Sequence, residues 1–261
     1  MASDLAHGRA THLPPQLADL RRRCREAAVV CDFDGTLAPI VDDPAMARPL
    51  PGALIVLRAL VERFLLVAVV SGRPAAFLAT HLPVPGLTRV GSYGLEQVTE
   101  EGVTEVAGAA AWRAAVAEAV ARAGDGAPPG VIVEDKGLSV TLHHRRAPAA
   151  AGWVRAFADA AAARGGLVVH DARMSIELRP PIAVDKGTVV SGLLAGAAAT
   201  AVCVCGDDGG DLPAFAAVAT LPVAVRVAAW SAEAPPELLA AADLVVRGPD
   251  GVLEVLRFLA G

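Results

Sequence analysis

Lysine is scarce in this sequence compared with arginine. Lysine and arginine together number 23 in the 261 residues, and only Lys136 and Lys186 are lysines. Both lie in the same tripeptide, Asp-Lys-Gly, at residues 135–137 and 185–187. Because a guanidinium is wide and planar whereas an ammonium is a compact point charge, these two positions predict chemistry that needs the smaller cation.

Other scarce features exclude whole classes of protein. The net charge is −5 and no basic patch indicates nucleic-acid binding. No apolar segment reaches the roughly 18 residues of a membrane span without a charge or a Pro/Gly break, and the N-terminal 30 residues lack the apolar stretch of a secretory signal. The four cysteines have the spacing of neither a zinc site nor a disulfide framework, so we expect buried, reduced thiols. We therefore expect a cytoplasmic protein, a monomer with a dimer left open, that binds neither nucleic acid nor membrane.

Short valine-rich runs and alanine-rich segments of helical length dominate what is present. Their alternation predicts βα units around a parallel sheet. Ligands of such sheets bind at the carboxyl ends of the strands, so we look for chemistry there. The runs span residues 27–33, 64–72, 88–94, 200–208, 222–227 and 242–248.

The rhythm changes between residues 104 and 180. Here two alanine-rich helices each precede a pair of strands, which predicts an αββαββ unit complete in itself. We predict a core formed by residues 1–103 and 181–261 with a smaller α+β domain inserted at 104–180. The boundaries suggest hinges at Gly102 and at Pro180-Pro181.

Acidic residues follow two of the predicted strands. Asp32 and Asp34 end the first run, and Asp207 and Asp208 end the fourth, with Asp211 in the loop beyond. Close carboxylates repel one another unless a cation neutralises them, so we expect Mg²⁺ with Asp207 as a candidate ligand, and with Asp208 and Asp211 either behind the ligands or as alternatives to it.

An anion site is suggested where the second strand ends. Ser71 and Gly72 precede a helix, and a hydroxyl with free backbone N–H groups at that junction suits an anion, although serine is equally an ordinary helix N-cap.

In order, D-x-D-G-T, Ser-Gly, Lys186 at a helix start and G-D-D-x-x-D resemble the four motifs of the haloacid dehalogenase (HAD) superfamily. Six blocks, "DFDGTLAPIVDDP", "SGRP", "GSYGLE", "VEDKGLSVTLHHR", "IELRPPIAVDKG" and "GDDGGDLPAF", resemble the trehalose-6-phosphate phosphatase family within it.

This resemblance implies an α/β fold, with a HAD-like Rossmannoid core and a C2-type cap, and a phosphatase mechanism. Asp32 would be the nucleophile that forms an aspartyl-phosphate, and Asp34 the general acid and base. Mg²⁺ would be held by Asp32, the Asp34 carbonyl and Asp207. The phosphoryl oxygens would be bound by Ser71, Gly72 and Lys186.

The cap would choose the substrate. The resemblance assigns the sugar hydroxyls to Glu134, Lys136, Glu177 and Arg179, although each taken singly fits a solvated ion-pair face as well. The histidines of the inserted segment, His143, His144 and His170, are expected near the surface of their strands.

Two blocks depart from the family pattern. Tyr93 stands where the family has histidine, and Gly210 and Leu212 stand where it has threonine and glutamate. The predicted function is hydrolysis of trehalose 6-phosphate or a closely similar disaccharide phosphate. The departures keep open a pseudo-disaccharide phosphate of the validoxylamine 7′-phosphate type, from aminocyclitol antibiotic biosynthesis, or glucosylglycerol phosphate. More remote are a non-catalytic sugar-phosphate sensor and a phospho-aspartate receiver. A receiver would lack the D-x-D-G-T motif and the insert.

Overall fold

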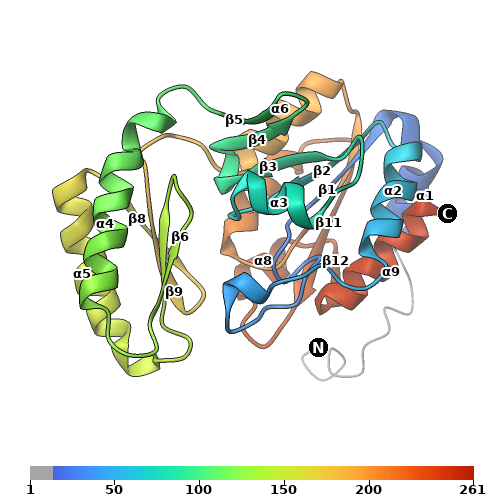
Figure 1. Ribbon diagram of the computed structural model, residues 1–261. Coiled ribbons are helices and arrows are strands. Elements are labelled where there is room, and N and C mark those ends of the chain that lie inside the picture. Colours follow the sequence, from blue (N-terminus) through green and yellow to red (C-terminus); the bar gives the residue numbers. More distant parts are fainter. Residues whose placement is uncertain (1–13) are drawn as a thin grey trace.

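Two lobes make up the structure, a computed structural model that describes residues 14–261. The segment in green and yellow forms the smaller lobe, and the rest of the described chain forms the larger one (Figure 1). Residues 1–13, which are part of the N-terminal stretch without the apolar segment of a secretory signal, lie outside the described residues. Within residues 14–261 no helix has the length and apolar character needed to cross a membrane.

A single sheet forms the centre of the larger lobe. Its strands are β1 (Ala27–Cys31), β2 (Leu66–Val70), β3 (Thr88–Gly91), β4 (Glu96–Thr99), β5 (Gly102–Glu105), β10 (Ala201–Gly206), β11 (Val223–Trp230) and β12 (Leu244–Arg247). The order across the sheet is β12-β11-β10-β1-β2-β3-β4-β5. The pairs from β12 to β3 are parallel, and β4 and β5 add an antiparallel hairpin at the edge. The predicted parallel α/β core is confirmed.

Helices cover both faces of this sheet because side chains alternate along each buried strand. Val29 and Cys31 face the apolar sides of α1, α2, α3 and α9, whereas Ala28 and Val30 face α6, α7 and α8. The helices are α1 (Pro15–Arg22), α2 (Ala53–Arg63), α3 (Ala75–His81), α6 (Lys186–Ala197), α7 (Leu212–Val218), α8 (Pro236–Ala241) and α9 (Gly248–Ala260). All four cysteines are free thiols, and all but the half-buried Cys24 are buried, largely as expected.

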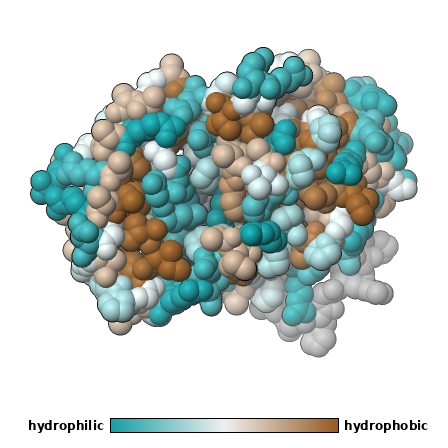
Figure 2. Space-filling view, in the orientation of Figure 1, coloured by the Kyte–Doolittle hydropathy of each residue, from teal (hydrophilic) through white to brown (hydrophobic). Residues whose placement is uncertain are grey.

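The smaller lobe has an antiparallel sheet of its own. Its strands are β6 (Ile132–Asp135), β7 (Val140–His143), β8 (Val168–Ala172) and β9 (Ser175–Arg179), in the order β6-β7-β9-β8. Apolar residues on one face pack against α4 (Arg113–Gly126) and α5 (Ala151–Gly165). The other face is polar. On the side of the molecule seen in Figure 2, hydrophobic and hydrophilic residues intermingle over both lobes.

The connection between the lobes differs in detail from the expected boundary. Strand β5 pairs with β4 in the sheet of the larger lobe, so the chain leaves that sheet after Glu105. Gly102, with φ +125°, begins β5 at the turn of this hairpin and does not lie at the junction, so the hinge expected there is misplaced. An apolar cluster of Leu95, Ala109 and Leu138 fills the space where the connections pass.

Candidate active site

The chain turns sharply after β1 and carries two aspartates past the end of the strand. The Asp32 N–H still donates to the Cys205 carbonyl at 3.0 Å, continuing the ladder with β10. Gly35 then adopts φ +72°, a region that side chains disfavour. A Cβ at Gly35 would approach Asp207 Oδ2 to 2.0 Å, so the turn needs glycine for space as well as for conformation.

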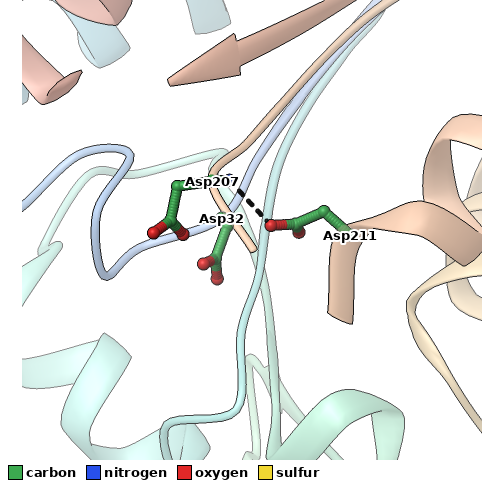
Figure 3. A group of neighbouring side chains, drawn as sticks. All are labelled: Asp32, Asp207 and Asp211. Carbon is green, nitrogen blue, oxygen red and sulfur yellow. Dashed lines mark hydrogen bonds between the residues drawn. The ribbon is translucent and has the colours of Figure 1, made fainter. Parts of the chain in front are cut away.

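Three buried carboxylates meet at this edge of the sheet. Asp32 and Asp207 extend from the ends of β1 and β10, and Asp211 reaches toward them from a helical turn (Figure 3). One oxygen from each lies within 4.8 Å of the others. Burial, together with the neighbouring carboxylates, raises the pKa of Asp32 to about 7, despite the Lys186 ammonium 3.0 Å away. Burial, then repulsion from Asp208 and Asp32, likewise holds the pKa of Asp207 well above its usual range.

This cluster fits a hard divalent cation. Magnesium prefers carboxylate and carbonyl oxygens, and a positive charge here would offset the repulsion that burial leaves unscreened. Asp32 and Asp207 present the oxygens best placed to bind it. Both oxygens of Asp211 are already engaged, one by Lys186 Nζ at 2.7 Å and the other by the N–H groups of Asp207 at 2.9 Å and Asp208 at 3.2 Å. Asp211 therefore holds the loop and the lysine in place.

Two arginines that the sequence patterns did not single out bind the acids of this site. Arg73 donates to both oxygens of Asp34, at 2.7 and 2.8 Å, and to Glu134 of the smaller lobe at 3.1 Å. Arg173, in the turn between β8 and β9, donates to Asp207 Oδ2 at 3.1 Å and to the Asp207 carbonyl at 3.0 Å. Arg73 is part of the "SGRP" block, which could have indicated a role for it, but nothing in the sequence indicated Arg173.

A cavity of about 140 Å³ lies between the lobes and unites most of the predicted residues. Its lining includes Asp32, Asp34, Ser71, Gly72, Glu134, Lys136, Glu177, Lys186, Asp207 and Asp208. Arg179 does not line it. Its guanidinium lies 3.3 Å from the centroid of the Tyr93 ring, and Tyr93 itself is part of the wall.

The polar face of the smaller sheet forms the other side of the cavity. Glu134, Thr141 and Glu177 are cross-strand neighbours on β6, β7 and β9. Glu177 is 1% exposed and accepts from Ser139 Oγ at 2.6 Å and Lys136 Nζ at 3.3 Å. Burial alone would raise its pKa, but Lys136 and Arg179 outweigh burial and lower the pKa to about 2. A solvated ion-pair face is therefore excluded for Glu177.

His143 also belongs to this wall. Its Nε2 lies 2.8 Å from Glu134 Oε2 and it lines the cavity, so the expectation of a surface residue is wrong for this histidine. The hydrogen bond, after an opposing effect of burial, helps to lower the pKa of Glu134, together with Lys136 and Arg73. Thr141 is 3% exposed and its hydroxyl has no hydrogen-bond partner among the described residues, which leaves a donor and acceptor available to a ligand.

Comparison with known proteins gives consistent matches. The family model for trehalose-phosphatase matches residues 30–235. The trehalose-phosphate phosphatase of Mycobacterium avium (strain 104) is 40% identical over 208 residues, covering 76% of this chain and 53% of that protein. That of Mycobacterium marinum is 41% identical over 209 residues, covering 77% and 53%. The chain thus spans about half the length of the curated relatives it matches.

Solved structures share the fold. The C-terminal domain of a Candida albicans trehalose-6-phosphate phosphatase superposes with a TM-score of 0.79 at 22% identity, covering 97% of this chain and 99% of that one. A haloacid dehalogenase-like hydrolase from Bacteroides thetaiotaomicron gives a TM-score of 0.63 at 18% identity, covering 89% and 99%. The predicted HAD-like fold is confirmed.

Proposed function

The chain belongs to the trehalose-phosphatase family, and on that premise we propose that it hydrolyses trehalose 6-phosphate, or a closely similar disaccharide phosphate, with Mg²⁺ as its cofactor. One observation carries the proposal. A single cavity joins the carboxylates and lysine at the strand ends to the polar face of the smaller sheet, so a phosphate and a sugar can be bound together. We further propose that the core (1–103 and 181–261, its sheet extending to Glu105) does the chemistry and that the inserted segment acts as a cap.

Asp32 is the proposed nucleophile. Its carboxylate attacks phosphorus, an aspartyl-phosphate forms, and the bond from phosphorus to the sugar oxygen breaks. Asp34 gives that oxygen a proton, then takes one from the water that hydrolyses the aspartyl-phosphate and releases phosphate. Arg73 holds both oxygens of Asp34 in the structure, so one of these two contacts has to open before that oxygen can carry the proton that is transferred.

Charge has to be balanced around the transferred group. Mg²⁺ would be held by Asp32, Asp207 and the Asp34 carbonyl, and when bound it supplies positive charge between the anionic nucleophile and the anionic phosphate. Ser71, Gly72 and Lys186 bind the phosphoryl oxygens. Such transfer depends mostly on positioning and electrostatics, so these donors contribute directly to the rate.

The cap face suits a sugar. Glu134 and Glu177 offer acceptors, Lys136 offers donors, and Thr141 between the two acids offers both, which is what vicinal hydroxyls require. A second candidate substrate is a pseudo-disaccharide phosphate of the validoxylamine 7′-phosphate type or glucosylglycerol phosphate. Tyr93, a departure from the family pattern, lines the cavity beside Gly72 and keeps this second candidate open.

The proposed setting is the cytoplasm, with a small sugar phosphate as the only partner and a monomer as the working state. Free thiols support a reducing compartment, since all four cysteines are unpaired in the structure.

Phosphate release from a panel of phosphorylated mono- and disaccharides, including a pseudo-disaccharide phosphate, tests the function. Asp32→Asn should lower kcat by at least about 1000-fold because the nucleophile is lost. Asp125→Asn on α4, an exposed acid that makes no ion pair within residues 14–261, is the matched control and should behave as wild type. Near wild-type turnover by Asp32→Asn would refute the assignment, and binding without turnover by the wild type would indicate a sensor.

Metal dependence is tested on the same protein. Thorough chelation should abolish turnover and added Mg²⁺ should restore it. Mg²⁺ should also raise the melting temperature of the wild type and raise it less in Asp207→Asn, because neutralised buried carboxylates repel less. Full activity after chelation would contradict the proposal, and a preference for trehalose 6-phosphate of less than about tenfold would leave it one substrate among several.

A further inference from the structure

The single tyrosine of the chain stands in the cavity wall, tied to the phosphate-binding loop. Three backbone hydrogen bonds join the segment around it to residues 71–73. Ser71 N–H donates to the Val90 carbonyl at 3.0 Å, Tyr93 N–H to the Ser71 carbonyl at 2.9 Å, and Ser92 N–H to the Arg73 carbonyl at 2.8 Å. Tyr93 therefore moves with the loop that holds Ser71 and Gly72.

The backbone at this place is strained. Ser92 and Tyr93 have φ values of 49° and 56°, and left-handed residues other than glycine each cost on the order of 1–2 kcal/mol. Buried Glu96 holds the turn by accepting from Ser92 Oγ at 2.6 Å and from the Ala75 N–H at 3.0 Å. Strain that the surroundings impose in this way marks a position where the direction of a side chain matters.

The ring itself is wedged between two glycines and an arginine. A Cβ at Gly72 would lie 2.5 Å from Tyr93 Cζ and 2.6 Å from its hydroxyl oxygen, and a Cβ at Gly210 would lie 3.6 Å from Cε1. The Arg179 guanidinium covers the ring at 3.3 Å from the centroid. Tyr93 and Gly210, two of the departures from the family pattern, are thus neighbours.

The direction of the hydroxyl follows from these contacts. Its oxygen lies over Gly72, while Lys186 Nζ is 5.9 Å from the ring centroid on the same cavity. We propose that the Tyr93 hydroxyl donates a hydrogen bond to a phosphoryl oxygen of the substrate, beside the groups contributed by Ser71, Gly72 and Lys186. The inference rests on the proposed phosphatase function and adds a binding residue to it. Burial raises the pKa of Tyr93, which keeps the phenol protonated as a donor.

Tyr93→Phe tests the proposal because it removes only the hydroxyl and keeps the ring beneath Arg179. We measure the inhibition constant of inorganic phosphate with p-nitrophenyl phosphate as a generic substrate, and the affinity for inorganic phosphate by calorimetry. Tyr93→Phe should lower the affinity for inorganic phosphate about tenfold, since a hydrogen bond to a charged group is lost. The kcat/KM for p-nitrophenyl phosphate and for the sugar phosphate should fall by similar factors, with an unchanged melting temperature.

Thr141→Val is the matched control on the opposite wall, where it also removes one hydroxyl and keeps the shape. This variant should bind trehalose more weakly than the wild type and should bind inorganic phosphate with the affinity of the wild type. An unchanged phosphate affinity in Tyr93→Phe overturns the proposal, as does a loss confined to the sugar. If the wild type binds phosphate and hydrolyses p-nitrophenyl phosphate but no sugar phosphate, the proposed substrate fails while the role of Tyr93 is still decided.

Discussion

Each of the two lysines lies between two carboxylates. Lys186 is 3% exposed, and its Nζ is 3.0 Å from Asp32 and 2.7 Å from Asp211. Lys136 Nζ is 3.3 Å from Glu177 and 3.9 Å from Glu134. A compact ammonium can approach two acids and a substrate oxygen at once, whereas a guanidinium needs a plane of free space. The presence of lysine thus has the same steric basis at both positions, one at the proposed phosphate end of the cavity and one at the proposed sugar end.

Replacing each lysine by arginine should separate the two ends. Lys186→Arg should lower kcat about 100-fold or more, because the wider group cannot bind the phosphoryl oxygens without displacing Asp32 or Asp211. Lys136→Arg should mainly change the ratio of kcat/KM values among sugar phosphates, with a smaller loss on p-nitrophenyl phosphate. Equal losses on every substrate from both variants would contradict this separation, provided that both melt as the wild type does.

The strands could be predicted from the sequence, but their contacts across the cavity could not. Valine runs ending in aspartate or serine mark β1, β2 and β10 because a buried parallel strand has a strong local pattern. The β4–β5 hairpin escaped notice because it is short, polar and lies at an edge. Arg173 and His143 were missed because their partners, Asp207 and Glu134, come into reach only when the lobes face each other or the strands pair.

The buried Glu177 in the smaller sheet should make the stability of the protein depend on pH. The pKa of Glu177 is about 2 in the folded protein and about 4.3 in an unfolded chain, so folding favours its carboxylate. Its contribution, roughly 3 kcal/mol, is fully present above about pH 4.5 and is lost as the pH falls toward 2. The gap in unfolding free energy between wild type and Glu177→Gln should therefore narrow over that range in urea titrations.

Glu118→Gln on α4 controls for a general charge effect, because Glu118 is exposed and its ion pair with Arg122 spans 4.0 Å. The difference in unfolding free energy between wild type and Glu118→Gln should stay small at every pH. A gap between wild type and Glu177→Gln that is constant from pH 5 to 2.5 would show that the ion pairs of Glu177 do not favour its charged form.

Charged contacts join the two lobes around the cavity. Arg73 reaches Glu134 across the gap, and Arg173 reaches Asp207 in the opposite direction. At the rim, Arg145 donates to both oxygens of Glu233, at 2.9 and 3.0 Å, and Arg173 Nε lies 3.6 Å from the same carboxylate. The inner contacts use groups that line the cavity and belong to the proposed site, whereas Glu233 does not line the cavity. Closure held in this way is sensitive to ionic strength.

Glu233→Gln should therefore loosen the cap without altering the chemistry. Glu233 is 45% exposed, so each ion pair contributes only about 0.2–1 kcal/mol, and losing both should raise the open fraction a few-fold. The radius of gyration from small-angle X-ray scattering should increase at low salt, KM should rise, and turnover of p-nitrophenyl phosphate should change little. Added salt should bring the wild type toward the variant and leave the variant almost unchanged. Glu237→Gln on α8, an exposed acid without an ion pair in the described chain, should match the wild type. A variant with the wild-type radius and the wild-type salt response would show that the ion pairs of Glu233 do not hold the lobes together, which leaves the inner ion pairs and the apolar cluster around Leu138.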